Sequence, residues 1–169
     1  ELALRQSEQR FRDITAAAGE YIWECDRSGR YIYLSEVVES VLGIPPHRLL
    51  GRTPFEMMPA EEADRVEKMF ARWVHEGQGF HNLEHASVHA DGSLRWQRVS
   101  ASPVYDDQGV MIGLRGTAMD ITERKVAEER AGKAQLQLRD AIESLDAGMV
   151  IYDSDEKLVV CNQKYKALY

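Results

Sequence analysis

The sequence predicts an α+β fold in which one antiparallel sheet carries short helices on one face. Its β-rich runs fall into two groups, two runs before and three after a helical region that prolines interrupt. Hairpins that are joined by helices favour an antiparallel sheet with its helices on one side. We therefore expect a five-stranded sheet, flanked by an N-terminal helix and by a C-terminal helix that follows the last strand without a loop.

The first two elements along the chain are a helix and a hairpin. Residues 1–18 contain neither proline nor glycine. Leu4, Phe11 and Ile14 fall on one stripe of the expected helix. The next stretch, YIWECDRSGRYIYL, holds two β-rich runs around Asp-Arg-Ser-Gly. Such runs around a turn sequence indicate a hairpin.

The middle of the chain is a helical region that prolines break into short pieces. Ser35 can cap a short helix that ends at Gly43. Four prolines follow between residues 45 and 59 and allow only short helical turns. A longer helix is expected from Ala60 to His75, because its apolar residues recur at spacings of three, four and seven.

Three strand-like runs follow between residues 83 and 120. Asp91-Gly92 predicts a two-residue hairpin turn between the first two runs. Residues 106–109, Asp-Asp-Gln-Gly, separate the second run from the third. These three runs complete the expected sheet.

The charged segment that follows the last strand predicts a coiled-coil helix. Its small and apolar residues recur at alternating spacings of four and three, namely Ala127, Ala131, Ala134, Leu138, Ala141 and Leu145. This spacing is typical of the seam of a coiled coil, here a parallel dimer. The alternative is a solvated linker helix that uses the same stripe to lie on its own domain.

The junction between the last strand and this helix predicts a stiff connection. The Asp120 carboxylate can accept hydrogen bonds from the first free N–H groups of the helix, and Glu123 can reach back in a capping box. Both carboxylates also suit the positive end of the helix dipole. With Ile121 and Thr122 between them, these residues are our candidate signal relay from the sheet into the helix.

The chain partly repeats itself after a shift of 127 residues. RDITAAAGEYIWECDRSGRYIYLS overlays RDAIESLDAGMVIYDSDEKLVVCN, so that Asp26 meets Asp153 and Ser35 meets Asn162. A helix, a strand, an Asp-rich turn and a strand recur in the same order. We interpret the second copy as the start of the same module, although a chance similarity of two hairpins is the alternative.

The composition excludes several classes of protein. With 44% apolar and 29% charged residues, the chain can bury a core and disorder is not expected. A net charge of -7 argues against nucleic acid and anionic membranes as partners. The apolar runs are too short to span a bilayer, so we expect no membrane contact by this segment.

The cysteines indicate the cellular compartment, and the first residue bears on the length of the protein. Cys25 and Cys161 are the only cysteines and lie far apart, which favours a reducing compartment and therefore the cytoplasm. The sequence does not begin with Met, so we expect it to be a piece of a longer protein.

Residues from about Phe11 to Lys125 resemble a PAS domain with its C-terminal PAC segment. The resemblance rests on ECDRSGRYIYLSEVVESVLGIPPHRLLGRTPFEMM, on HADGSLRWQRVSASPVYDDQGVMIGLRGTAMDITERK, and on their order. The DITER ending is the most specific piece, since this family uses it as the exit from the last strand into a signalling helix. Residues 141–169 resemble the opening of another PAS domain, with Asn162 where the family often has Asn.

The resemblance implies an organisation and a role. We divide the chain into an N-terminal helix (1–10), a PAS/PAC domain (11–124), a coiled-coil linker helix (125–140) and a truncated start of a second PAS domain (141–169). The implied role is that of a sensor that dimerises through its flanking helices and controls a downstream output domain. A histidine kinase is the first choice for that output, a diguanylate cyclase is an alternative, and a ligand-free interaction module is a third possibility.

The resemblance also implies a ligand pocket between the sheet and the helices. We expect its lining to be Trp23, Tyr33, Val41, Phe55, Met69, Phe70 and Trp96. The ligand could be a non-covalent flavin or a small metabolite, because Trp23 and Trp96 could pack against the ring of a flavin. The plainer role of both tryptophans is core packing. In the isolated fragment we expect no cofactor.

Two cofactor chemistries of the family are not expected. The photoactive flavin subclass uses a cysteine in the helical region, and this chain has none there. Haem would need an axial ligand, and the one candidate, His75, falls at a helix end where exposure is expected.

The sequence shows no catalytic constellation and no metal motif. His81, His85 and His89 are spaced by four, but on a strand this spacing separates the ring origins by roughly 13 Å, too far for one ion. We expect them to be solvent-facing strand histidines. The fragment is therefore not expected to be an enzyme, although the full-length protein could be one.

Overall fold

The computed structural model describes residues 2–167, so the expected helix start at Glu1 and the end at Tyr169 lie outside the described residues. The chain forms two compact units, residues 1–123 and 124–169, which are described separately. The boundaries predicted at residues 10, 124 and 140 stay predictions. Helix runs without a break across residue 10 and also across residue 140.

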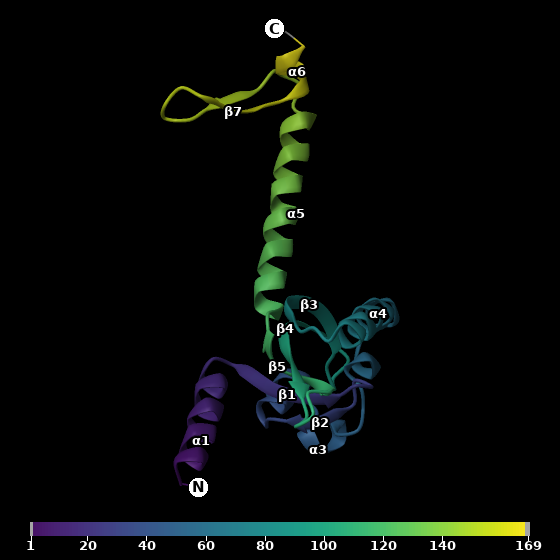
Figure 1. The fold of residues 1–169 in the computed structure, drawn as a ribbon. Helices are drawn as coiled ribbons and strands as arrows, with labels where there is room; N and C mark the ends of the chain where they lie inside the picture. The colour runs from purple at the N-terminus through teal and green to yellow at the C-terminus, as the bar shows by residue number, and fades with distance from the viewer. Residues whose placement is uncertain (1, 168–169) are drawn as a thin grey trace. The chain divides into compact units, whose positions relative to one another are not determined.

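The first unit contains most of the secondary structure (Figure 1). In chain order it holds α1 (Leu2–Ala17), β1 (Glu20–Asp26), β2 (Tyr31–Leu34), α2 (Val37–Leu42), α3 (Pro46–Leu49), the 3-10 helix η1 (Pro54–Met57), α4 (Ala60–Glu76), β3 (Phe80–Val88), β4 (Leu94–Tyr105) and β5 (Met111–Asp120). The five strands form one sheet in the order β2-β1-β5-β4-β3. Every neighbouring pair is antiparallel, which confirms the predicted α+β fold.

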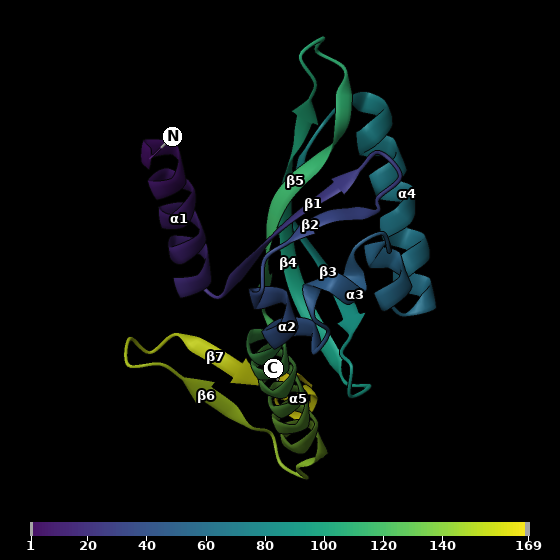
Figure 2. The same ribbon diagram turned by 90° about the horizontal axis from the view of Figure 1, so that it is seen from below.

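The core lies between this sheet and the helices between β2 and β3. Figure 2 shows α3 and α4 together on one side of the sheet. Val38 of α2, Leu49 of α3 and Leu114 of β5 are completely buried in one apolar cluster with the strands. Helix α4 presents Val66 and Phe70 to the same core, as its apolar spacing predicts.

Helix α1 differs from the other helices because its apolar side chains are not buried. Leu4, Phe11 and Ile14 are each more than half exposed. Thr15 is the buried residue of α1, and its hydroxyl donates to backbone carbonyls of the same helix. The predicted apolar stripe of α1 therefore remains largely exposed within residues 2–167.

Two local predictions from the sequence are wrong. Ser35 does not cap α2 with its side chain; its Oγ instead accepts a hydrogen bond from the Ile22 N–H at 2.9 Å. Asp91-Gly92 is not a two-residue turn, because the bond from the His89 N–H to the Ser93 carbonyl encloses three residues. A two-residue type I′ turn needs positive φ at both positions, and of this pair Gly92 alone has it.

The second unit holds the remaining elements. Helix α5 (Thr122–Ser144) begins directly after β5 and is followed by β6 (Val150–Tyr152), β7 (Leu158–Cys161) and α6 (Gln163–Lys166). The two strands form a separate antiparallel hairpin. Its apolar side chains Ile151, Leu158 and Val159 are exposed, so the described part of the chain does not complete a core around this hairpin.

Hydrogen bonds show that the internal repeat is structural. In the first hairpin, Asp26 Oδ1 accepts from the N–H groups two and four residues later, and Asp153 Oδ1 does the same in the second. Ser35 Oγ accepts from the Ile22 N–H, and Asn162 Oδ1 accepts from the Met149 N–H, again 127 residues later. Residues at equivalent positions of the two copies therefore accept equivalent hydrogen bonds.

Candidate functional site

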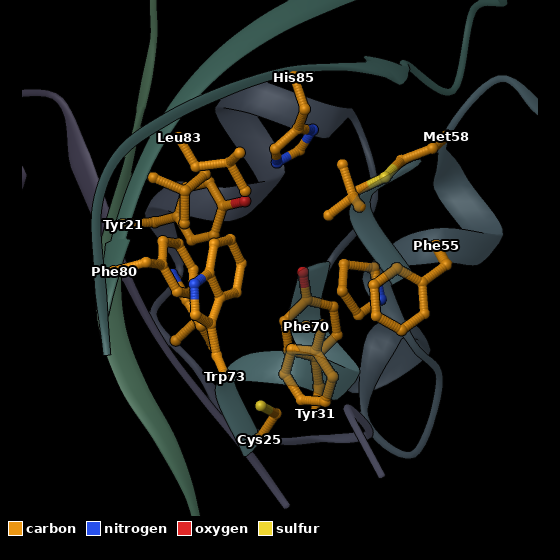
Figure 3. A pocket seen from close by; sticks show the side chains of 14 residues that line it. Tyr21, Cys25, Tyr31, Phe55, Met58, Phe70, Trp73, Phe80, Leu83 and His85 are labelled. Atoms are coloured by element: carbon orange, nitrogen blue, oxygen red, sulfur yellow. The ribbon is translucent and has the colours of Figure 1, made fainter. Parts of the chain in front are cut away.

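The first unit encloses a cavity between the sheet and the helices η1 and α4 (Figure 3). Its volume is about 40 Å³. Since a water molecule needs ~10–15 Å³ of such space, the cavity holds a few waters at most. Its walls are mostly aromatic and aliphatic: Tyr21, Trp23, Cys25, Tyr31, Pro54, Phe55, Met58, Val66, Phe70, Trp73, Phe80, Leu83, His85 and Val99.

Two groups of packed rings form the walls of the cavity. On one side Trp73 stacks on Phe80 with ring centroids 4.2 Å apart, and Trp23 lies 6.4 Å from the same Phe80 ring. On the other side Phe55 and Phe70 meet edge to face at 5.6 Å. Rings in such contact hold one another in place, so the aromatic walls are fixed by packing between β1, β3, η1 and α4.

The polar groups come from β1, β4 and β3, and Tyr21 of β1 reaches across β5 to Gln97 of β4. The Tyr21 hydroxyl donates to Gln97 Oε1 at 2.5 Å, and Gln97 Nε2 donates to Ser87 Oγ at 2.9 Å. Ser87 Oγ lies 3.4 Å from Nδ1 of His85, whose ring lines the cavity. These four side chains form a buried line that runs from β1, across β5, to β4 and β3.

Burial changes the acid–base properties of the groups around the cavity. Loss of hydration lowers the pKa of His85 below its usual value, a shift that the Ala86 carbonyl and Glu62 oppose. Burial also raises the pKa of Tyr21, and it raises the pKa of the Cys25 thiol to about 12. The cavity therefore presents neutral hydroxyl, thiol and imidazole groups near pH 7.

Helix α4 is bonded to strand β3 beside His85. Arg65 pairs with Glu62 at 2.6 Å and donates from the same nitrogen to the Glu84 carbonyl at 2.9 Å. Glu62 Oε1 also accepts from the Ala86 N–H at 3.4 Å. These bonds join α4, which forms one wall of the cavity, to the edge strand β3 of the sheet.

The seven residues proposed as pocket lining divide into two groups. Trp23, Phe55 and Phe70 line the cavity. The other four do not: Val41 is buried elsewhere in the core, and Tyr33, Met69 and Trp96 are half-buried outside the lining. Because side chains alternate along a strand, the inward position of Gln97 places Trp96 on the opposite face.

The prediction that the three strand histidines face solvent is wrong for His85. Only 6% of its surface is exposed, whereas His81 is exposed and His89 is half-buried. The alternation of Leu83, His85 and Ser87 on one face of β3 was the signal that placed it inward. Sequence reasoning also missed Gln97, since glutamine is a residue type found mostly at the surface.

The strand-to-helix junction is bonded as the sequence predicts for Asp120, though not for Glu123. Asp120 Oδ1 accepts from the Thr122 N–H at 2.8 Å and from the Thr122 hydroxyl. The Ile121 N–H donates to the Trp96 carbonyl at 2.8 Å. Glu123 lies in the first turn of α5, where its charge suits the helix dipole, and makes no capping bond to Asp120 within the described residues.

Neither a metal centre nor a large cofactor fits the groups described. Among residues 2–167, no three His, Cys, Asp or Glu side chains lie close enough together to hold a metal ion. Pockets for drug-sized ligands measure ~300–1,000 Å³, so a flavin or a haem does not fit this cavity as shaped. His75 lies exposed in the last turn of α4 and does not line the cavity.

Membrane insertion of the described helices is not supported by their composition. None of the helices within residues 2–167 combines the length and the apolar character that crossing a bilayer requires.

One curated relative and two solved structures illustrate what the chain resembles. It is 31% identical over 161 residues to the methanogenesis regulatory histidine kinase FilI of Methanothrix harundinacea, covering 92% of this chain and 17% of that protein. A sensory box histidine kinase/response regulator from Burkholderia thailandensis superimposes with a TM-score of 0.63 at 22% identity, covering 78% of this chain and 98% of that one. The chain spans 14 to 20% of the length of four curated relatives that it matches.

The second solved structure was determined with a ligand. It is the PAS domain of the RpfR quorum-sensing receptor from Cronobacter turicensis in complex with the fatty acid C12:0. It superimposes with a TM-score of 0.53 at 20% identity, covering 62% of this chain and 95% of that one. At this identity the likeness shows a shared fold.

Sequence profiles give the family directly. Residues 11–126 match the PAS fold, and residues 136–169 match a PAS domain. The first match covers the five-stranded sheet and its helices, and the second covers the hairpin that repeats after 127 residues. The chain therefore belongs to the PAS family, as one sensory PAS domain followed by the start of a second.

Proposed function

We propose that the first PAS domain binds a small, largely apolar molecule in its cavity and relays the bound state through α5 to an output domain of the same protein. The enclosed aromatic cavity with its buried polar line is the observation that carries this proposal. The proposed output is a histidine kinase, which is what the relative FilI is called. The proposed location is the cytoplasm, in keeping with two free cysteines.

The proposed ligand class follows from the lining. Its rings and aliphatic groups favour an apolar body, while Tyr21 and His85 offer hydrogen bonds to one polar group. A fatty acid has this character, and the similar RpfR domain holds one. Because the cavity is small, such a ligand must displace flexible wall residues, and Met58 is suited to this by its unbranched side chain.

Relay through α5 is proposed from the bonds at its first residues. Asp120, Ile121 and Thr122 connect β5 and β4 to the first turn, so a shift in the sheet has little slack before it reaches the helix. Such a relay requires two arrangements that a ligand binds unequally. Glu123, in the same turn, adds a favourable charge rather than a bond.

Dimerisation through the flanking helices is part of the proposal. In α1, Leu4, Phe11 and Ile14 are exposed, and in α5 the predicted seam from Ala127 to Leu145 is exposed along its length. An unpartnered apolar stripe with heptad spacing favours a parallel helix pair with a second copy of the chain.

Thermal unfolding tests ligand binding. We would measure the melting of the 169-residue chain with and without linear carboxylic acids, dodecanoic acid being the longest. A ligand at a hundred times its Kd stabilises the folded state by ~2.7 kcal/mol. Val66→Phe, which fills the cavity, should abolish the effect, whereas the exposed Val88→Phe should keep it. No stabilisation by any acid, together with no molecule co-purifying, would count against a sensor of apolar ligands.

A ligand-free interaction module is the second candidate function. The small cavity and the exposed stripe of α1 favour it, since a dimerisation domain needs a surface rather than a pocket. Sedimentation of the chain as a dimer that no acid perturbs would support this candidate.

For the output, histidine autophosphorylation by the full-length protein would support a kinase, and cyclic dinucleotide synthesis from GTP would support the diguanylate cyclase alternative.

A further inference from the structure

Gln97 is the most deeply buried amide side chain around the cavity. It lies on β4, is 1% exposed, and bonds at both ends: Oε1 accepts from the Tyr21 hydroxyl and Nε2 donates to Ser87 Oγ. An unpaired buried polar group costs ~1–3 kcal/mol, so the amide must follow its partners if they move. One side chain therefore links β4 to β1, across β5, and to β3, in addition to the backbone ladders.

Both ends of this bonded group line the cavity. Tyr21 lines the cavity directly, and so does His85, which lies 3.4 Å from Ser87 Oγ. Glu62 and Arg65 of α4 face His85 from the other side, with opposite charges. Anything that moves the Tyr21 or His85 side chain changes the geometry at a bond of Gln97.

The backbone next to Gln97 is bonded to the start of α5. The neighbouring Trp96 accepts from the Ile121 N–H at 2.8 Å and donates its own N–H to Thr122 Oγ1 at 2.9 Å. Gln97 itself is the register partner of Asp120 across the β4–β5 ladder. A tilt of the peptide between Trp96 and Gln97 therefore alters the bonds that hold the first residues of the helix.

We propose that Gln97 is the positioning residue that couples the cavity to the first turn of α5. This inference rests on the proposed function, because it names the route by which the cavity would reach the helix. Hydrogen bonds are directional, so a displaced partner turns the amide and the adjoining peptide with it. Apolar wall residues such as Leu83 and Val99 pack by dispersion, which allows sliding and transmits no fixed direction.

Amide exchange and amide chemical shifts in the ligand-free 169-residue chain test the coupling. Ser87→Ala removes the acceptor of the Gln97 amide without touching residues 121–122. The Ile121 N–H should then exchange roughly two- to tenfold faster, the factor expected for loss of one net hydrogen bond. Leu83→Val, on the same strand and in the cavity wall, is the matched control and should leave Ile121 unchanged.

A double-mutant cycle shows whether Gln97 carries the effect. In a Gln97→Met background, Ser87→Ala should no longer alter the shifts of Ile121 and Thr122. Gln97→Glu should restore the effect, because burial keeps its carboxyl protonated as both donor and acceptor. If Gln97→Met does not fold, Tyr21→Phe takes its place as the second perturbation and must also move the Ile121 signal.

Three outcomes would overturn the coupling role. They are an Ile121 signal that ignores Ser87→Ala, an equal response to Leu83→Val, and an effect of Ser87→Ala that persists with Gln97→Met. Since no ligand is used, these outcomes leave the binding proposal intact. Conversely, a chain that binds no acid can still show the coupling, so the two failures are distinguishable.

Discussion

The backbone N–H of Trp96 donates to the hydroxyl oxygen of Thr122 at 2.9 Å, so strand β4 is bonded to the first residue of helix α5. The same hydroxyl donates to Asp120 Oδ1, which also accepts from the Thr122 N–H. Thr122 thus joins Asp120, the last residue of β5, to the neighbouring strand β4. This arrangement predicts that the helix start is ordered by side chains rather than by backbone alone.

Thr122→Val should destabilise the start of α5 because it removes the acceptor of the Trp96 N–H at nearly constant volume. The unpaired N–H should cost about 1 kcal/mol, the low end for a buried donor, since the site is only half-buried. Denaturant unfolding measures the loss. Thr122→Ser keeps the hydroxyl and should unfold close to the wild-type chain; equal losses in both variants would show that the hydroxyl bond is unimportant.

Asp120→Ala should lower the free energy of unfolding by roughly 0.5–2 kcal/mol, the usual effect of losing a side-chain cap. It should also accelerate exchange of the Thr122 N–H, which loses its acceptor. The control is Asp107→Ala, an exposed aspartate in the β4–β5 loop. If both alanine variants unfold alike and the output of the full-length protein is unchanged, the junction is not a coupler.

Gly29 and Glu156 occupy equivalent turn positions, and both have positive φ, 79° and 59°. A side chain in this conformation costs roughly 1–2 kcal/mol. Gly29→Ala should therefore destabilise the first unit by at least about 1 kcal/mol, and its Cβ would also lie 3.2 Å from the Phe55 ring. Unfolding curves would measure the effect.

The same comparison predicts a gain of stability in the second hairpin. Glu156→Gly should relieve the strained backbone and stabilise this turn by up to about 1 kcal/mol. Exchange of the Asp153 N–H, which donates to the Lys157 carbonyl at 2.8 Å, should slow accordingly. Asp155→Gly is the control, because φ is not positive there, and it should make the same amide exchange faster.

Protonation of His85 should destabilise the fold. Its pKa is lower in the folded chain than in the unfolded chain, because burial disfavours the charged ring. The unfolded state therefore binds more protons, and stability falls as the pH drops from about 6.5 toward the folded pKa. The free energy of unfolding should decline less over this range in His85→Gln than in the wild-type chain.

His81→Gln provides the control for this pH dependence, because His81 is exposed on the same strand. Its pH profile should follow that of the wild-type chain. If His85→Gln and His81→Gln give superimposable profiles, burial of the His85 ring contributes nothing to the acid sensitivity of the fold.

The sequence predicted the sheet, the hairpins and α4 well because their patterns are local. Helical spacing at Val66 and Phe70 identifies α4 and its buried side, and two β-rich runs around a turn sequence identify the first hairpin. The apolar aromatic residues Trp23 and Phe70 were placed at the cavity for the same reason.

The buried polar residues could not be predicted in this way. His85 and Gln97 occupy inward positions of β3 and β4, although their polarity suggests solvent. The partner of His85, Ser87, lies on the same strand, whereas Gln97 bonds to Ser87 and Tyr21 on other strands. Trp96 shows the converse: a large ring suggests the core, yet its strand parity points it away from the cavity. At all three positions strand parity outweighs the preference that the residue type suggests, and for Gln97 the partners that satisfy its amide lie on other strands.

The most direct test of relay from the cavity is to follow the amide signals of Ile121 and Thr122 while dodecanoic acid is added to the chain. The account predicts that signals of Trp23 and Phe70 shift on binding and that those of Ile121 and Thr122 shift in proportion. The coupling from cavity to helix would be contradicted if the cavity signals saturate while residues 121 and 122 remain unchanged.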